Sequence, residues 1–334
     1  MILVTGATGR LGARIVRLLR QARLEVRCLV RPGSQYFWLN DTGAAYFFGD
    51  LRDPASLQRA VAGCTHVIHA AQVQVETHDN HHTVTTLEGA RALFEAASEA
   101  GVRHLVMVSC AGAEAGWPAA AFDCLGQAEA ALTASGLSHS ILRCGVFAGT
   151  FADAARRAQA GQAAVLLGNP TATVRPLARQ DASLFAVAAL DHPELRGRAV
   201  TLVGPEALTV QEALDRACAV AGVSGARVLS GPAAKLAIRA AGLAGRRWRN
   251  ALTRQSLMLS RPVEADTAAL AQRLGLPLTG FDDAVRSSLD TARPWEDPEA
   301  RHTQVVHRQF QATVYEPGVT PWSELPEGPR RLDG

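Results

Sequence analysis

Lysine is almost absent from this sequence: Lys235 is the only one, although lysine and arginine together account for 34 of the 334 residues. Tyrosine is nearly as scarce, with Tyr36, Tyr46 and Tyr315. A site that depends on either side chain therefore has few positions to draw on. The formal net charge of +3 is small and spread along the chain, so the composition argues against nucleic acid as the main partner.

Long apolar runs and signal sequences are also missing. No run reaches the roughly 20 residues that a membrane-spanning helix needs, and the first residues lack the charged region and cleavage site of a signal peptide. We therefore expect a cytoplasmic protein without a membrane span. The cysteines lie far apart with no CxxC pair, which favours reduced thiols over a disulfide framework or a zinc site. Their positions are Cys28, Cys64, Cys110, Cys124, Cys144 and Cys218.

Short apolar runs alternate with amphipathic helical stretches as far as about residue 203. In the first helical stretch, for example, Leu11, Ile15 and Leu18 follow the helical spacing of i, i+4 and i+7. Alternating strands and helices with right-handed crossovers predict an α/β fold with a doubly wound parallel (Rossmann) sheet, whose ligand lies at the carboxyl ends of the strands. The predicted strands are residues 2–5, 25–30, 44–48, 66–71, 103–109, 138–143 and 199–203.

The pattern changes after the last of these strands, and most later segments have helical spacing. We expect a first domain over residues 1–203 and a smaller, mostly helical C-terminal lobe over residues 204–292, which would bind a substrate or a partner. Residues 151–178 are predicted to contribute to this second lobe. Residues 293–334 are rich in proline and carry aromatic side chains, so we expect an extended C-terminal tail that wraps the body or a partner.

The stretch VTGATGRLG lies between the first predicted strand and the first predicted helix. Its glycines allow the backbone to turn sharply and to approach a pyrophosphate that a Cβ atom would exclude. The N-terminus of the helix supplies free N–H groups and a favourable dipole for the same anion. In this strand-to-helix context the pattern predicts a dinucleotide-binding loop rather than a plain tight turn. The loop residues expected to bind the cofactor are Gly6, Thr8, Gly9, Arg10, Leu11 and Gly12.

The second predicted strand is followed by Arg31, at a place where a protein that prefers NAD usually has an acidic residue. A guanidinium here suits the 2′-phosphate of NADP(H), which it holds through charge-assisted hydrogen bonds. The alternative is a solvent-exposed arginine, so NADP(H) is the preferred cofactor and NAD(H) stays open. Along the same edge of the sheet we also expect cofactor contacts from Asp50, Leu51, Ala70, Ala71 and Ser109.

Further motifs follow in the order LVRPG, FFGDLRDPASL, VIHAA, AGVRHLVMVS and ASGLSHSILR. Together with TGATGRLG, they resemble the atypical short-chain dehydrogenase/reductase group, which includes NmrA-type redox sensors and the nucleotide-binding accessory subunit of respiratory complex I. The resemblance continues through RQDASLFAVAAL, LVGPEALTVQEAL and LTRQSLMLSR, so it covers roughly residues 1–292 and leaves the tail outside. It implies an NADP(H)-binding protein, in a group whose catalytic activity varies among its members.

In active members of this group, a serine and a tyrosine polarise a substrate carbonyl, and a lysine four residues after the tyrosine lowers its pKa. Ser109 matches the serine, with Cys110 beside it, but the other two residues are missing. In the segment WPAAAFDCLGQAE, residues 117–129, the tyrosine is replaced by Phe122 or a neighbouring residue, and the lysine by Leu125 or Gly126. Without this proton donor the standard general-acid mechanism is not available.

A different proton donor stays open. Cys110, Cys124 and Cys144 are predicted at strand ends or on the following helix, near the nicotinamide. One of these cysteines, or Asp123, would then act as an acid or as a redox-responsive group. The catalytic candidates are Ser109, Cys110 and Asp123. The alternative is that these cysteines are small buried hydrophobic residues, since only a thiol with a lowered pKa and solvent access is reactive.

Two further segments carry side chains that bind ligands in other proteins. HDNHH, with His78, His81 and His82, matches no standard zinc spacing, so we expect a polar loop over the site and no metal. GRRWRNALTR places Arg246 on a basic helix that either faces solvent, with Trp248 packed inward, or lies on an anionic membrane or protein surface. A protein partner would contact this helix or residues 293–334.

The sequence supports two functions. In the first, the protein binds NADP(H) as a structural or sensed ligand and acts through a protein partner. In the second, it is an NAD(P)H-dependent oxidoreductase or epimerase-like enzyme that acts on a small carbonyl substrate with a non-standard proton donor. The missing tyrosine and lysine favour the first function, whereas the glycine loop is compatible with both.

Overall fold

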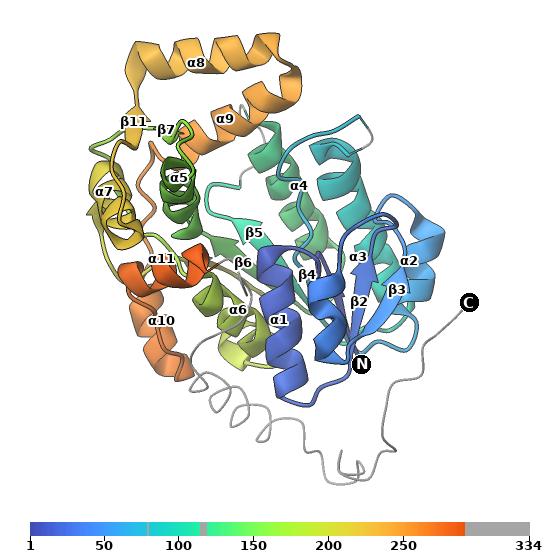
Figure 1. The fold of residues 1–334 in the computed structure, drawn as a ribbon. Coiled ribbons are helices and arrows are strands. Elements are labelled where there is room, and N and C mark those ends of the chain that lie inside the picture. Colours follow the sequence, from blue (N-terminus) through green and yellow to red (C-terminus); the bar gives the residue numbers. More distant parts are fainter. Residues whose placement is uncertain (79, 114–118, 291–334) are drawn as a thin grey trace.

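The computed structural model describes residues 1–78, 80–113 and 119–290. The predicted tail, residues 293–334, lies outside these ranges. The described chain forms a central sheet with helices on both faces and a second group of helices beside it (Figure 1).

Seven parallel strands form the central sheet, in the order β3-β2-β1-β4-β5-β6-β9. The predicted doubly wound parallel sheet is confirmed, and each predicted strand boundary lies within two residues of the observed one. Strands β2 and β3 extend the sheet to one side of β1, and β4 and the strands after it extend the sheet to the other side. Ligands of such sheets bind at this switch point between β1 and β4. The strands are β1 Ile2–Thr5, β2 Val26–Val30, β3 Ala45–Phe48, β4 His66–His69, β5 His104–Cys110, β6 His139–Cys144 and β9 Arg198–Leu202.

The central strand β5 has the nearly continuous apolar sequence of a strand that is covered on both faces. Its first residue, His104, is buried, and hydrogen bonds of 2.8 and 3.0 Å join its two ring nitrogens and the hydroxyls of Ser138 and Ser140. Burial lowers the pKa of His104 to about 4, so the ring is neutral at physiological pH.

Helices cover both faces of the sheet (Figure 1). α1 and α6 share a core with Val4 on one face, and α2, α3 and α4 share a core with Leu3 on the other. The neighbouring residues Leu3 and Val4 thus point to opposite faces, as the two-residue period of a strand requires. These helices are α1 Arg10–Gln21, α2 Pro54–Val61, α3 Gly89–Glu99, α4 Ala120–Ala134 and α6 Arg179–Ala188.

The second group of helices has a core of its own around Phe151 and Phe281, whose ring centroids are 5.9 Å apart. Two small sheets that the sequence did not predict support it, because β7 pairs with β11 and β8 pairs with β10. Each pair joins a strand from residues 151–178 to a strand beyond residue 204. The elements are α5 Gly149–Gln159, β7 Val165–Leu167, β8 Thr173–Val174, β10 Leu208–Thr209, α7 Val210–Ala221, β11 Arg227–Leu229 and α11 Phe281–Leu289.

Two helices, α8 Gly231–Leu243 and α9 Arg246–Met258, form a hairpin that projects from this group (Figure 1). Trp248 on α9 is 45% exposed, so the expectation that it packs inward is wrong. Within the described ranges, no helix is long and apolar enough to cross a membrane. The remaining elements are α10 Thr267–Leu274, the 3-10 turns Phe37–Thr42 and Pro193–Leu195, and the π-helical turn His82–Glu88.

Candidate functional site

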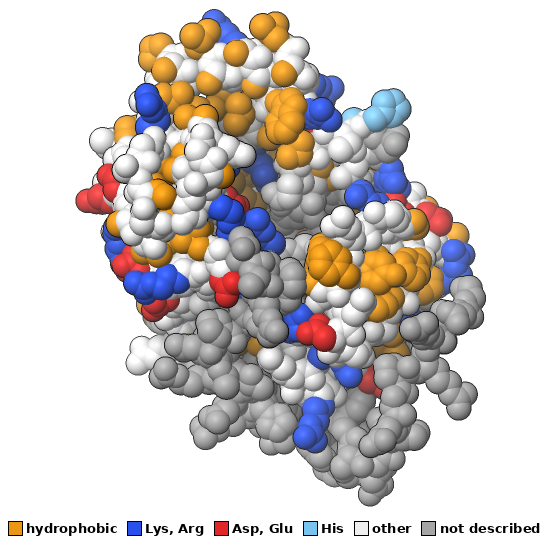
Figure 2. All heavy atoms as spheres, in the orientation of Figure 1, with side chains coloured by type: hydrophobic (Ala, Val, Ile, Leu, Met, Phe, Trp, Pro, Cys, Tyr) orange, Lys and Arg blue, Asp and Glu red, His pale blue; other side chains and the backbone are white. Residues whose placement is uncertain are grey.

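A cavity of about 710 Å³ lies at the carboxyl ends of β1, β2, β4, β5 and β6. This volume is typical of a pocket for a cofactor or a small molecule. Figure 2 shows a hollow near the middle of this face, with Lys or Arg side chains at its edge. All the residues predicted to contact the cofactor line the cavity, although the contacts themselves stay a prediction. They are Gly6, Thr8, Gly9, Arg10, Leu11, Gly12, Arg31, Asp50, Leu51, Ala70, Ala71 and Ser109.

The glycine loop joins β1 to α1 through close backbone contacts. Gly6 has a φ of 70°, and a Cβ atom there would lie 2.6 Å from the backbone nitrogen of Ala71. A Cβ atom on Gly12 would lie 2.1 Å from the carbonyl oxygen of Gly6. Gly9 differs, because it is the N-cap of α1 and leaves the first-turn N–H groups uncovered by a side chain. The loop therefore fits a pyrophosphate, which would accept hydrogen bonds from these groups.

Arg31 follows β2 and is exposed at the edge of the cavity. Nearby, Asp50 follows β3 and forms an ion pair with Arg52, with 2.6 Å between nitrogen and oxygen. Hydrogen bonds from Arg52 hold the pKa of Asp50 below its usual value, and the charge of Arg31 adds a smaller effect in the same direction. Because Arg52 neutralises this carboxylate, the charge of Arg31 is left for an anionic ligand.

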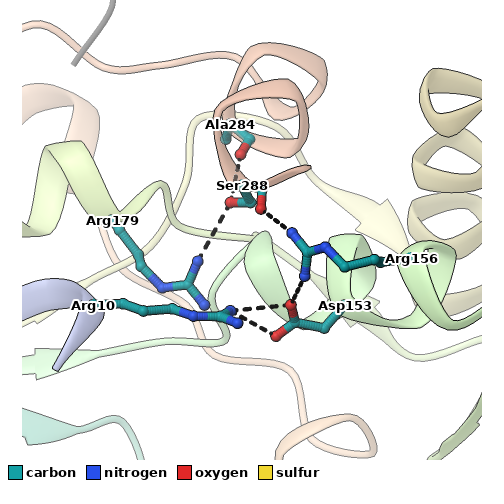
Figure 3. A network of polar contacts seen from close by, with 6 residues as sticks. All are labelled: Arg10, Asp153, Arg156, Arg179, Ala284 and Ser288. Carbon is teal, nitrogen blue, oxygen red and sulfur yellow. Dashed lines mark hydrogen bonds and ion pairs between the residues drawn. The ribbon is translucent and has the colours of Figure 1, made fainter. Parts of the chain in front are cut away.

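A network of arginines connects α1 with the second group of helices (Figure 3). Arg10 donates to both carboxylate oxygens of Asp153 on α5, at 2.9 and 3.0 Å. Arg156 donates to Asp153 at 2.5 Å and to the backbone carbonyl of Ser288 on α11. Arg179 on α6 donates to the Ser288 hydroxyl at 3.4 Å. The side chain of Arg10 is therefore engaged by the protein, so its contact with a cofactor would be through the backbone.

Arg179 is confined against the start of α5, where a Cβ atom on Gly149 would lie 2.2 Å from its Nη1 atom. It lines the cavity, and burial together with the charge of Arg10 lowers its pKa to about 10. A desolvated guanidinium gains stability when an anion binds beside it. Arg179 is thus suited to an anionic group close to the glycine loop.

Ser109 forms a triad with Glu129 and Arg143, in which Ser109 and Glu129 are buried and Arg143 is half-buried. Its hydroxyl donates to one oxygen of Glu129 at 2.5 Å, and Arg143 donates to the other at 2.5 and 2.8 Å. A serine hydroxyl has a single proton to donate. Ser109 therefore cannot polarise a substrate carbonyl while this triad is intact, although it lines the cavity.

The helix on which we expect the tyrosine and the lysine is α4, and it carries apolar side chains at Phe122 and Leu125. Phe122 and Leu125 line a small pocket of about 10 Å³ that also borders Arg254. Asp123 lies on the same helix and accepts a hydrogen bond from Gln127 at 3.1 Å, and it is not among the described residues that line the larger cavity. The structure therefore gives no support to Asp123 as a proton donor.

Burial raises the pKa of every cysteine thiol in the sequence. Cys110 and Cys144 line the cavity, and the pKa of Cys110 is raised to about 11. Cys124 is not among the described residues of the cavity wall. Because a reactive thiol needs a lowered pKa, the structure favours the interpretation of these residues as small buried hydrophobic side chains.

Arg254 belongs to the stretch GRRWRNALTR, which the sequence analysis placed only on a basic helix. In the structure it is on α9 and lines the cavity at the end near Cys110. Its guanidinium donates to Gln74 at 2.8 Å, and burial lowers its pKa. One turn earlier, Asn250 donates to the carboxylate of Glu76 at 2.6 Å. These two contacts hold α9 over the loop that follows β4. Among the described residues Arg254 makes no ion pair within 4.0 Å, so its charge is available to a ligand.

The histidine-rich segment contributes polar side chains to the cavity. Asn80 and Thr85 line it, and the Thr85 hydroxyl donates to Asn80 at 2.7 Å. The His81 ring forms a hydrogen bond with the backbone carbonyl of His78 at 2.7 Å. In the part of the chain that the structure describes, no group of three or more His, Cys, Asp or Glu side chains is placed to hold a metal ion.

The comparison with protein families decides the class of this protein. A family model described as NAD(P)H-binding matches residues 6–193, which contain the glycine loop and most of the cavity wall. The chain belongs to this NAD(P)H-binding family. The predicted resemblance to NmrA-like atypical short-chain dehydrogenases is thereby confirmed, as is the prediction of a nicotinamide dinucleotide as the ligand.

The relatives of this chain differ in their named functions. The chain is 32% identical over 230 residues to an NAD(P)H azoreductase of Xenophilus azovorans, an alignment that covers 66% of this chain and 74% of the azoreductase. It is 26% identical over 223 residues to the photosystem II assembly factor Ycf39 of Trieres chinensis, covering 67% and 70% of the two chains. The relatives thus include both a reductase and an assembly factor.

Solved structures share the fold at low identity. The NADPH-dependent quinone oxidoreductase QOR2 of Escherichia coli, complexed with NADPH, has a TM-score of 0.65 at 20% identity and covers 86% of this chain and 99% of its own. UDP-glucose 4-epimerase of Thermus thermophilus, complexed with NAD, has a TM-score of 0.66 at 22% identity and covers 87% and 98%. These likenesses establish the fold.

Proposed function

We propose that this protein is an NADPH-dependent reductase that delivers a hydride directly to a conjugated acceptor, such as a quinone or an azo compound. The observation that carries the proposal is Arg254, a partly buried cation without a carboxylate partner among the described residues, which lines the end of the cavity near Cys110. A second ligand with negative charge, present or developing, suits this end of the cavity.

The residues that would hold NADPH follow from their order along the sheet. Arg31 would bind the 2′-phosphate at the end of β2, and the N-terminus of α1 with Arg179 would bind the pyrophosphate. From β2 to β5 is three strand spacings, about 14 Å, which an extended dinucleotide spans. Bound NADPH supplies a hydride. The groups that meet the nicotinamide end are then Cys110 and Arg254.

The cavity favours an acceptor that needs no proton from the protein. None of the described residues that line it is a tyrosine or a lysine, and the Ser109 proton is directed to Glu129. An aliphatic ketone requires an acid as its oxygen gains charge, whereas a conjugated acceptor spreads that charge over many atoms. Arg254 would stabilise the resulting anion electrostatically in a site with little water. The name of the azoreductase relative agrees with this class of acceptor.

The test is the oxidation of NADPH, followed by its absorbance, with a quinone, an azo dye and an aliphatic ketone as acceptors. The quinone or the azo dye should be reduced and the ketone should not. Arg254→Met should lower kcat/KM roughly tenfold to a hundredfold, the range expected for a lost hydrogen bond to a charged group. Arg249→Met is the matched control, because Arg249 is on the same helix and is exposed. Reduction of the ketone, or equal effects of the two variants, would contradict the proposal.

A second candidate function is that NADP(H) is a structural or sensed ligand and the protein acts through a partner. The missing acid and the relative named as an assembly factor favour it. The exchange of bound nucleotide with labelled NADPH, followed by native mass spectrometry, separates the two candidates. Exchange much slower than any turnover would support the structural role, and exchange at least as fast as turnover would support the reductase.

A further inference from the structure

The α8–α9 hairpin exposes apolar side chains to solvent. α8 packs against α9, and Ala234 is its one buried residue. Leu236 is 68% exposed and Leu243 is 93% exposed. Figure 2 shows hydrophobic side chains gathered over the projecting hairpin. Apolar residues of this size are normally buried, so such a surface marks a contact with another body.

The exposed apolar residues of α8 lie on one side of the helix. They are spaced i, i+1, i+4, i+8 and i+11, which keeps them within about a third of the helix circumference at 100° per residue. The buried Ala234 lies on the opposite side, against α9. We call this surface the α8 stripe; it consists of Pro232, Ala233, Leu236, Ala240 and Leu243, all exposed.

Positive charge borders the α8 stripe. Lys235 and Arg239 are four residues apart, so they form one edge of it, and Arg246, Arg247 and Arg249 follow at the start of α9. The sequence has no aspartate or glutamate between Asp215 and Glu264. Trp248, also exposed, has the guanidinium of Arg247 at 5.4 Å from its ring centroid. The hairpin therefore combines apolar and aromatic groups with basic groups only.

We propose that the α8–α9 hairpin docks on an anionic lipid surface. Apolar residues on one side, basic residues beside them and an exposed tryptophan are the features of helices that lie in a membrane interface. A protein partner would have a rim of mixed charge, which calls for some acidic residues in the hairpin. An anionic lipid surface carries only negative charge, and the charged residues of the hairpin are all positive. This inference is independent of the reductase proposal.

The test is sedimentation of the full chain with vesicles. Vesicles of equal parts phosphatidylglycerol and phosphatidylcholine should bind the protein, and vesicles of phosphatidylcholine alone should bind it much more weakly. Leu236→Glu with Leu243→Glu should abolish binding. Lys235→Gln with Arg239→Gln should weaken it roughly 30-fold, since each basic residue near an anionic surface contributes about a fivefold factor.

Phe37→Glu is the matched control, because Phe37 is 64% exposed on the first domain and outside the hairpin. It should leave vesicle binding unchanged, and thermal unfolding of each variant should match that of the native chain. If a leucine variant unfolds, the Lys235→Gln with Arg239→Gln variant decides the question. No binding to the anionic vesicles, or an equal loss in Phe37→Glu, overturns the proposal.

Discussion

Replacing Arg31 with alanine should weaken the binding of NADPH and leave the binding of NADH nearly unchanged. A hydrogen bond to a charged group contributes about 1.5–3 kcal/mol, and Arg31 is exposed, so we expect the lower end of this range. About 1.5 kcal/mol corresponds to roughly a tenfold increase in the Kd for NADPH. The selectivity of the native protein should also shrink with added salt, because an exposed charge pair is screened.

Isothermal titration of each variant with NADPH and with NADH measures both effects. Arg103→Ala is the control, since Arg103 is exposed and is not among the described residues of the cavity wall. Arg52→Ala is a second test. Because it removes the ion-pair partner of Asp50 beside Arg31, it should weaken the binding of NADPH more than the binding of NADH. Equal losses for NADPH and NADH in Arg31→Ala would refute the assignment of the 2′-phosphate to this residue.

Three further predictions follow from the site and the core. Gly9→Asp should abolish the rise in Tm that NADPH causes by mass action, because a carboxylate at the α1 N-cap would repel the pyrophosphate; a retained rise would argue against this site. Arg179→Met should raise the Kd for NADPH and NADH by the same factor, roughly tenfold, since both share the pyrophosphate, and a selective effect would place Arg179 elsewhere. Burial lowers the pKa of His69 and His104 from 6.5 to about 4, so between these pH values the unfolded chain binds more protons than the folded chain. The free energy of unfolding should therefore fall as the pH decreases from about 6.5 to about 4. Equal urea midpoints at pH 7 and pH 5 would contradict this account of the core.

The sequence predicts the central sheet well because its strands are continuous apolar runs, each followed by a helix. Once the strands are known, the sequence also predicts the residues at their carboxyl ends that line the cavity, because parallel sheets bind their ligands at this edge. The pairs β7–β11 and β8–β10 were not predicted, because each strand has only two or three residues and its partner is far along the chain. Such short strands form only where tertiary contacts support them.

Arg179 and Glu129 were missed, and Arg254 was assigned only to a basic helix, because their importance arises from packing between distant segments. Nothing in the local sequence shows that Glu129 receives the Ser109 hydroxyl, or that Arg254 extends to Gln74. A weak signal exists for Arg254, since its four-residue spacing from Asn250 places both on one face of a predicted helix. The wrong expectation for Trp248 came from assuming that a large aromatic ring on a helix faces the core.

Direct hydride transfer in this cavity is the central claim, and a single-turnover reaction with deuterated NADPH tests it most directly. The protein is loaded with NADPH carrying deuterium at C4, mixed with a quinone, and followed by the loss of NADPH absorbance. We expect a primary isotope effect on the rate, which Cys110→Ala and Asp123→Asn leave unchanged because neither group supplies a proton in the rate-limiting step. Bound NADPH that persists unoxidised in the presence of every conjugated acceptor would contradict the claim and point to a structural role for the dinucleotide.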